Sequence, residues 1–89
     1  MGRRYGFAMT SDPDFDDELD ATGLLCPLPV LKARKRLAGL APGAVLRMLA
    51  DDPAARVDVP HFCAEQGHAL IAQEDAPGGV MVFHLRKGG

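Results

Sequence analysis

The pattern of hydrophobic and polar residues divides most of the chain into short alternating and helical stretches. Leu19 and Ala21 lie two apart, which is typical of one face of a short strand. A later run is apolar on both faces except at Arg47, which indicates a strand covered on one side and partly on the other. A loop containing Pro77-Gly78-Gly79 separates the last two apolar runs and predicts a hairpin. The strands are therefore predicted at 18–22, 44–50, 69–74 and 80–87.

A first helix is predicted from the region of Cys26 to about Leu40, followed by the stop signals Pro42 and Gly43. Its basic residues Lys32, Lys35 and Arg36 are expected to point away from the core. Helical spacing places a set of apolar residues on the inner face: Val30, Leu31, Leu37, Ala38 and Ala41.

A second helix is predicted to end at Gln66, before Gly67. It begins at about Ala54, or restarts at Asp58, which would then cap it with Pro60 in the first turn. Asp51-Asp52-Pro53 is a turn and a further candidate cap. Val59, Phe62 and Cys63 form the predicted inner stripe.

The predicted order β-α-β-α-β-β favours an α+β fold, a two-layer α/β sandwich. Both helices are expected on one face of a four-stranded mixed sheet. Residues 1–16 show neither the helical nor the strand period of apolar residues. They are predicted to be a mobile tail, either simply solvated or an acidic docking segment. Residues 17–89 are predicted to be a single domain.

Composition narrows the function classes. The 89 residues carry a formal charge of −2, which argues against a protein built to neutralise nucleic-acid phosphates. The longest stretch without charge, Ala21 to Leu31, is too short to span a membrane and holds two prolines. Two cysteines do not make a disulfide scaffold, so a reducing, cytoplasmic location is expected.

The most informative motif is Cys26-Pro27-Leu28-Pro29. Proline is harmless in a helix only within the first turn, so Pro27 and Pro29 place the helix start within two residues of Cys26. Each proline also pushes its predecessor out of the helical region, so either Cys26 or Leu28 is the cap. A helix N-terminus favours negative charge, and we therefore expect a lowered pKa for the Cys26 thiol. The alternative is a cysteine buried as a small hydrophobe at the strand–helix corner.

The motif and its surroundings resemble the TusA/SirA family of small sulfur-carrier proteins. The resemblance runs from Leu19 to Gly89 and rests on four blocks in order. These are Leu19-Asp20-Ala21-Thr22-Gly23-Leu24, Cys26-Pro27-Leu28-Pro29, Ala50-Asp51-Asp52-Pro53 with Asp58-Val59-Pro60-His61-Phe62-Cys63, and Leu85-Arg86-Lys87-Gly88-Gly89.

The resemblance implies a sulfurtransferase that acts as a carrier. Cys26 would accept sulfur as a persulfide from a cysteine desulfurase or a rhodanese-like donor and pass it to a downstream acceptor protein. Thiol exchange of this kind needs no metal and no organic cofactor, because the sulfur is carried covalently. In one branch of the family the relay ends in 2-thiouridine of tRNA; other branches serve sulfur oxidation or molybdenum cofactor assembly.

Two positions depart from the tRNA-thiolating branch, which has a basic residue before the cysteine and an acidic one between the prolines. Here Leu25 and Leu28 occupy those positions, which affects the expected partner surface more than the sulfur chemistry. The resemblance makes Arg34 and Asp52 candidate docking residues for a sulfur donor, with ordinary solvated charges as the alternative.

The basic face of the first helix has three interpretations: a solvated surface, a docking site for an acidic protein, or an RNA contact. Direct nucleic-acid binding is not expected, because no aromatic stacking residues lie nearby. The alternative function for the whole protein is a non-catalytic interaction module that uses this face. The residues concerned are Lys32, Arg34, Lys35 and Arg36.

The remaining cysteine and the histidines are weaker candidates. Cys63 is predicted to be buried, with a resolving role for Cys26 as the alternative. His61, Cys63 and His68 lack the paired spacing of a zinc site, so no metal site is predicted. His84 is predicted to lie at the surface or an edge, and no spacing supports its pairing with Cys26.

Overall fold

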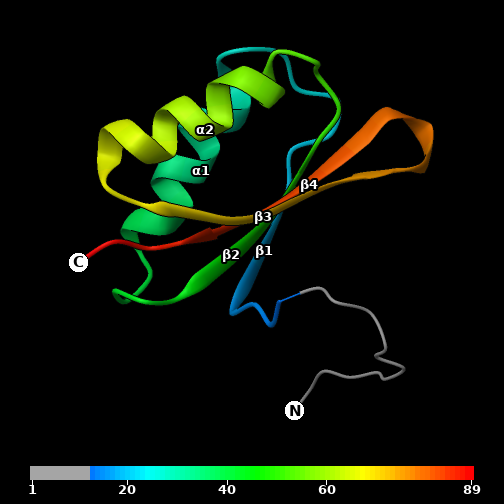
Figure 1. Ribbon diagram of the computed structural model, residues 1–89. Helices are drawn as coiled ribbons and strands as arrows, with labels where there is room; N and C mark the ends of the chain where they lie inside the picture. The colour runs from blue at the N-terminus through cyan, green and yellow to red at the C-terminus, as the bar shows by residue number, and fades with distance from the viewer. Residues whose placement is uncertain (1–12) are drawn as a thin grey trace.

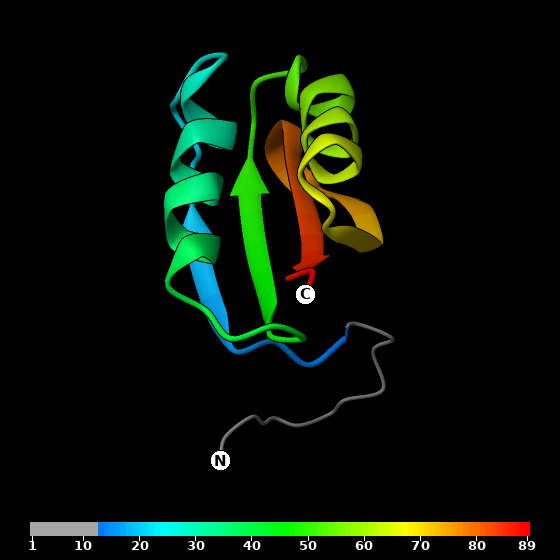
Figure 2. The same ribbon diagram turned by 90° about the vertical axis from the view of Figure 1, so that its left-hand side faces the viewer.

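Strands and helices follow one another in the predicted order in the computed structural model, which describes residues 13–89. The elements are β1 (Asp17–Asp20), α1 (Leu28–Ala38), β2 (Val45–Ala50), α2 (Ala55–Gln66), β3 (Ala69–Ala76), a short 3-10 turn (Pro77–Gly79) and β4 (Val80–Arg86). Both helices cover the same face of the sheet (Figures 1 and 2). The predicted two-layer α+β sandwich is therefore confirmed.

The four strands of the described chain form one mixed sheet in the order β1-β2-β4-β3. β1 pairs with β2 in parallel, across the connection made by α1. β4 runs antiparallel to both β2 and β3. The last strand in sequence thus lies inside the sheet, between two partners, and β2 and β4 are its central strands.

The core lies between the helices and the central strands. Alternate residues of β2 and β4 point to the helix layer and are almost inaccessible to solvent, as the strand period of two requires. The helices contribute the matching apolar stripes. The core includes Leu46, Met48 and Ala50 of β2, Met81, Phe83 and Leu85 of β4, Ala33 and Leu37 of α1, and Val59, Phe62 and Cys63 of α2.

The predicted inner face of α1 is only partly right. Leu37 is buried and Val30 packs against the core, but the side chain of Leu31 is 49% exposed. Ala38 and Ala41 are also exposed. The buried stripe follows the four-residue spacing Pro29, Ala33, Leu37, which rotates α1 so that Leu31 faces outward. The small Ala33 in the middle of this stripe suits a close approach of the helix to the sheet.

His84 is not at the surface, contrary to the prediction: it is 1% exposed. It lies on β4 between Arg47 of β2 and Ala72 of β3, so strands flank it on both sides. It alternates with the core residues Phe83 and Leu85 and so belongs to the opposite face of the sheet. The ring of Phe15 lies over this face, with its centroid 6.2 Å from that of His84.

The predicted tail, residues 1–16, lies largely outside the described residues. Its last two members contact the sheet. The N–H of Asp16 donates to the carbonyl of Val45 at 2.8 Å, and the Asp16 carboxylate accepts the N–H of Val45 at 2.8 Å. Phe15 lies under the guanidinium of Arg47 at 5.5 Å, a cation–π contact. Sheet contacts therefore begin at least two residues before β1.

Candidate functional site

The loop between β1 and α1 presents Cys26 at the surface. Pro27 is the N-cap of α1, and its carbonyl accepts the N–H of Leu31 at 3.2 Å. The peptide bond between Cys26 and Pro27 is cis. Neither Cys26 nor Leu28 is the cap, but the prediction that Cys26 lies within two residues of the helix start is confirmed. Pro29 falls in the first turn, as predicted, and is buried.

The loop between β2 and α2 holds the cysteine loop in place. The backbone N–H of Cys26 donates to Oδ2 of Asp52 at 2.8 Å, and the N–H of Gly23 donates to Oδ1 of Asp51 at 2.9 Å. Oδ1 of Asp52 accepts the N–H of Ala54 at 3.1 Å, at the start of α2. These two N–H donors lower the pKa of Asp52, because they stabilise its charged form. Asp52 thus ties Cys26 to the start of the second helix.

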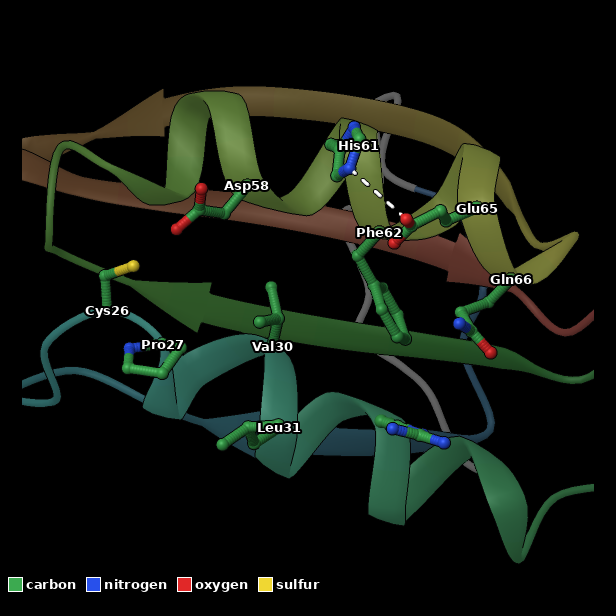
Figure 3. Close-up of a pocket in the computed structure, with 10 residues that line it drawn as sticks. Cys26, Pro27, Val30, Leu31, Asp58, His61, Phe62, Glu65 and Gln66 are labelled. Carbon is green, nitrogen blue, oxygen red and sulfur yellow. Dashed lines mark ion pairs between the residues drawn. The ribbon is translucent and has the colours of Figure 1, made fainter.

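The second helix begins at Ala55, in agreement with the earlier of the two predicted starts. Asp58 is therefore not a cap. It lies in the first turn, and Pro60 lies inside the helix. This placement turns the Asp58 carboxylate toward the sulfur of Cys26 (Figure 3).

The predicted lowering of the Cys26 pKa is wrong. The pKa of the thiol is raised, first because Asp58 accepts a hydrogen bond from it, then through desolvation and the negative charges of Asp58 and Asp52. Cys26 precedes the cap, so its own N–H is directed to Asp52 and its sulfur to Asp58 rather than to the free amides of α1.

Cys26 stands at one end of a groove between α1 and α2 (Figure 3). Its volume of about 280 Å³ is enough for a few amino-acid side chains from a partner. Its lining combines the apolar residues Pro27, Val30, Leu31 and Phe62 with charged residues from both helices. At the far end, His61 and Glu65 form an ion pair at 3.6 Å. The lining residues are Cys26, Pro27, Val30, Leu31, Arg34, Asp58, His61, Phe62, Glu65 and Gln66.

The candidate docking residues fall into two groups. Lys32, Arg34 and Lys35 are exposed on α1, and Arg34 also lines the groove. Arg36 is engaged: its guanidinium pairs with Asp17 at 3.2 Å and donates to the carbonyl of Glu18 at 2.8 Å. Arg36 therefore ties α1 to β1, and the freely exposed positive charge of this helix lies on the other three residues.

Exposed leucines surround the cysteine. Leu25 is 69% exposed and Leu28 is 45% exposed, one on each side of Cys26 and Pro27. With the half-exposed Leu31 they place an apolar surface next to the thiol, beside the basic residues of α1.

Local sequence patterns do not identify Asp58 and the α2 side of the groove as parts of the site. Asp58 was considered only as a cap, although it stands in one of the blocks that carry the family resemblance. Its contact with Cys26 links positions 32 residues apart, so no local spacing could reveal it. The signal in the sequence that points to these residues is the block of the family resemblance that contains Asp58, His61 and Phe62.

The second cysteine has a different environment. Cys63 is 3% exposed in the core, as predicted, and burial raises the pKa of its thiol to about 11. His68 is held by the N–H of Gly88, which donates to its Nδ1 at 3.0 Å. Among residues 13–89 no three His, Cys, Asp or Glu side chains come together as a metal site would require. In the same residues no helix has the length and apolar character of a membrane span.

Comparisons with known proteins agree on one family. The model of the family described as sulfurtransferase TusA matches residues 17–87. The sulfur carrier protein TusA of Pseudomonas paraeruginosa is 43% identical over 72 residues, which cover 81% of this chain and 90% of that protein. The same protein of Pseudomonas entomophila is 44% identical over 72 residues, with 81% and 89% covered. Among solved structures, a SirA-like protein from Desulfitobacterium hafniense superimposes with a TM-score of 0.74 at 28% identity, covering 83% of this chain and all of that one.

Proposed function

Since the chain belongs to the TusA family of sulfur carriers, we propose that Cys26 is the residue that carries the sulfur, as a persulfide. The observation that supports this most directly is the contrast between the two thiols. Cys26 is exposed at the end of a groove, whereas Cys63 is buried among apolar side chains. Sulfur transfer between proteins needs a thiol that a partner's sulfur can reach, and Cys26 meets that condition.

The proposed reaction is a thiol exchange. The sulfur of Cys26 attacks the terminal sulfur of a donor persulfide; the donor's S–S bond breaks, and a new one forms on Cys26. The donor leaves as a thiol, and the same exchange in reverse delivers the sulfur to an acceptor. Oxidation states balance between the two partners, so the reaction requires no metal or organic cofactor.

The proposed partners are a cysteine desulfurase or a rhodanese-like donor, and a downstream acceptor protein. Lys32, Arg34 and Lys35 are exposed on the helix that follows Cys26 and supply positive charge for docking an acidic partner surface. Leu25 and Leu28 add apolar contact area directly beside the sulfur. Reducing conditions keep such a thiol available, which supports a cytoplasmic location.

For the destination of the sulfur we propose 2-thiouridine synthesis in tRNA. The support is the 43% identity to proteins named sulfur carrier protein TusA. Deleting the gene should deplete 2-thiouridine in total tRNA digests, and a copy with Cys26→Ser should not restore it. Unchanged 2-thiouridine in the deletion strain would mean that the sulfur goes to another acceptor. It would not affect the proposed carrier role of Cys26.

Loading of the protein tests the carrier role. Incubation with a cysteine desulfurase and L-cysteine should add the mass of one sulfur atom to the intact protein. The adduct should be absent in Cys26→Ser and present in Cys63→Ser. Loading of Cys26→Ser to the same extent as the unaltered protein would refute the proposal.

A further inference from the structure

The carboxylates of Asp52 and Asp58 both lie near Cys26, but they face different parts of it: one the backbone, the other the sulfur. Both oxygens of Asp52 are occupied by backbone donors, the N–H of Cys26 at 2.8 Å and that of Ala54 at 3.1 Å. Asp52 therefore holds the backbone and is not directed at the sulfur. Asp58 is directed at the sulfur itself: both residues line the groove, and the Asp58 carboxylate points toward the Cys26 sulfur (Figure 3).

The position of Asp58 is well defined by its helix. Its N–H donates to the carbonyl of Ala54 at 2.8 Å in the first turn of α2. The next residue, Val59, is 1% exposed and anchors this turn in the core. The carboxylate is thus fixed to a rigid element on the opposite side of the groove from α1, which is the kind of support a reacting group needs.

Nothing in residues 13–89 neutralises the Asp58 carboxylate. Besides Asp58, the charged groups that line the groove are Arg34 from α1 and His61 and Glu65 from α2, and Asp52 of the preceding loop lies near Cys26. His61 pairs with Glu65, and Asp52 is held by backbone N–H groups. The ion pairs of the described residues include none between Arg34 and Asp58. The Asp58 carboxylate therefore faces the Cys26 thiol across the groove with no cationic partner among the described residues.

From this geometry we infer that Asp58 is a catalytic residue, the proton acceptor for Cys26 during sulfur transfer. This inference rests on the proposed function of Cys26. As the Cys26 sulfur attacks the terminal sulfur of the donor persulfide, its proton passes to Asp58. The donor's S–S bond breaks, and Asp58 returns the proton to the leaving sulfur, which departs as a thiol. One S–S bond forms, one breaks, and the proton is conserved.

A proton acceptor is useful here because the Cys26 thiol is protonated when no donor is bound. The pKa of the Cys26 thiol is raised by Asp58, by desolvation and by the charge of Asp52, so at neutral pH the thiol is more fully protonated than an ordinary cysteine. A positioned general base typically contributes about 10²- to 10⁴-fold to a proton transfer of this kind. Asp58 thus keeps the thiol protonated at rest and takes its proton when a donor is bound.

Two reactions of the Asp58→Asn variant distinguish a role of Asp58 in proton transfer from an effect on the pKa of the Cys26 thiol alone. The rate of alkylation by iodoacetamide reports the amount of Cys26 thiolate. The leaving group is iodide, which does not have to be protonated. Alkylation should become several-fold faster at pH 7, because the group that raises the thiol pKa is gone. Loading from glutathione persulfide, a small donor that needs no protein docking, should become at least about tenfold slower. Asp75→Asn, which makes the same charge change outside the groove, should alter neither rate.

The pH profile gives the second readout. Between about pH 6 and pH 8, loading of Asp58→Asn should fall about tenfold for each unit of decreasing pH relative to the unaltered protein, because only preformed thiolate can react. If Asp58→Asn loads faster, in parallel with its alkylation, Asp58 only tunes the thiol and the inference is wrong. Equal loading of the two proteins across this range would also overturn it. Thermal unfolding of the isosteric variant checks that it folds.

The inference and the proposed function can fail separately. If the unaltered protein does not load at Cys26 at all, the persulfide role fails first. If it loads and Asp58→Asn loads equally well, only the role of Asp58 is lost.

Discussion

The backbone N–H of Cys26 donates a 2.8 Å hydrogen bond to Asp52, a residue 26 positions further along the chain. This bond joins the cysteine loop to the start of α2, because the other oxygen of Asp52 binds the N–H of Ala54. One side chain therefore positions the backbone of Cys26 and that of Ala54, the residue directly before the helix that carries Asp58.

Replacing Asp52 by alanine should destabilise the protein and loosen the cysteine loop. Loss of the two backbone hydrogen bonds that the Asp52 carboxylate accepts should lower the midpoint of thermal unfolding of a domain this size by about 4–8 °C. Asp52→Asn should show a smaller loss, because the amide oxygen can satisfy only one of the two N–H donors. Thermal unfolding followed by circular dichroism at pH 7 measures both.

The same variant has a defined pH dependence. The pKa of Asp52 is lowered in the folded protein, so its contribution to stability is present above the unfolded value of 3.8. It is lost as the pH falls through the lowered folded value. The difference in melting temperature between Asp52→Ala and the unaltered protein should therefore shrink from about pH 6 to about pH 3. A difference that stays constant over this range would contradict the ionic role of Asp52.

Leu37 and Leu31 should differ sharply in their effect on stability. Leu37 is 1% exposed and Leu31 is 49% exposed, although both were predicted for the inner face of α1. Leu37→Ala should cost about 2–5 kcal/mol, since it leaves a cavity in the core. Leu31→Ala should remain within about 0.5 kcal/mol of the unaltered protein. Urea denaturation compares them, and equal losses would show that the orientation of α1 is wrong.

The two thiols should differ in their reaction with iodoacetamide. In the folded protein one equivalent should be incorporated, at Cys26, because Cys63 is buried and its pKa is raised to about 11. The rate at Cys26 should increase as the pH rises through its own raised pKa. Unfolding in guanidinium should expose the second thiol. Mass spectrometry of peptides gives the site, and early modification of Cys63 in the folded protein would contradict its burial.

The exposed lysines of α1 should matter for a protein donor and not for a small one. In Lys32→Gln/Lys35→Gln, loading by a cysteine desulfurase at low salt should slow by about tenfold, because charges at the rim of an interface mainly affect association. Loading from glutathione persulfide should be unchanged. Arg56→Gln/Arg86→Gln removes the same charge elsewhere and serves as the control. If both donors slow equally, the lysines do not act in docking.

The alternation of apolar residues predicted the sheet and both helices, because short strands and amphipathic helices leave local patterns. It could not predict that β4 lies between β2 and β3, and so it misplaced His84. The motif Cys26-Pro27-Leu28-Pro29 located an exposed thiol next to the start of α1, because proline constrains a helix start. The direction of its pKa shift depends on Asp52 and Asp58, which approach from a distant loop and helix, and a local argument from the helix terminus missed them.

The proposed function depends on Cys26 holding a sulfur atom that it can pass on. The most direct measurement loads the protein from L-cysteine labelled with ³⁵S through a cysteine desulfurase, removes the donor, and locates the label by peptide mapping. The label should be on the peptide containing Cys26 and should leave completely on addition of a thiol. Label on the peptide containing Cys63, or label that a thiol does not release, would contradict the account.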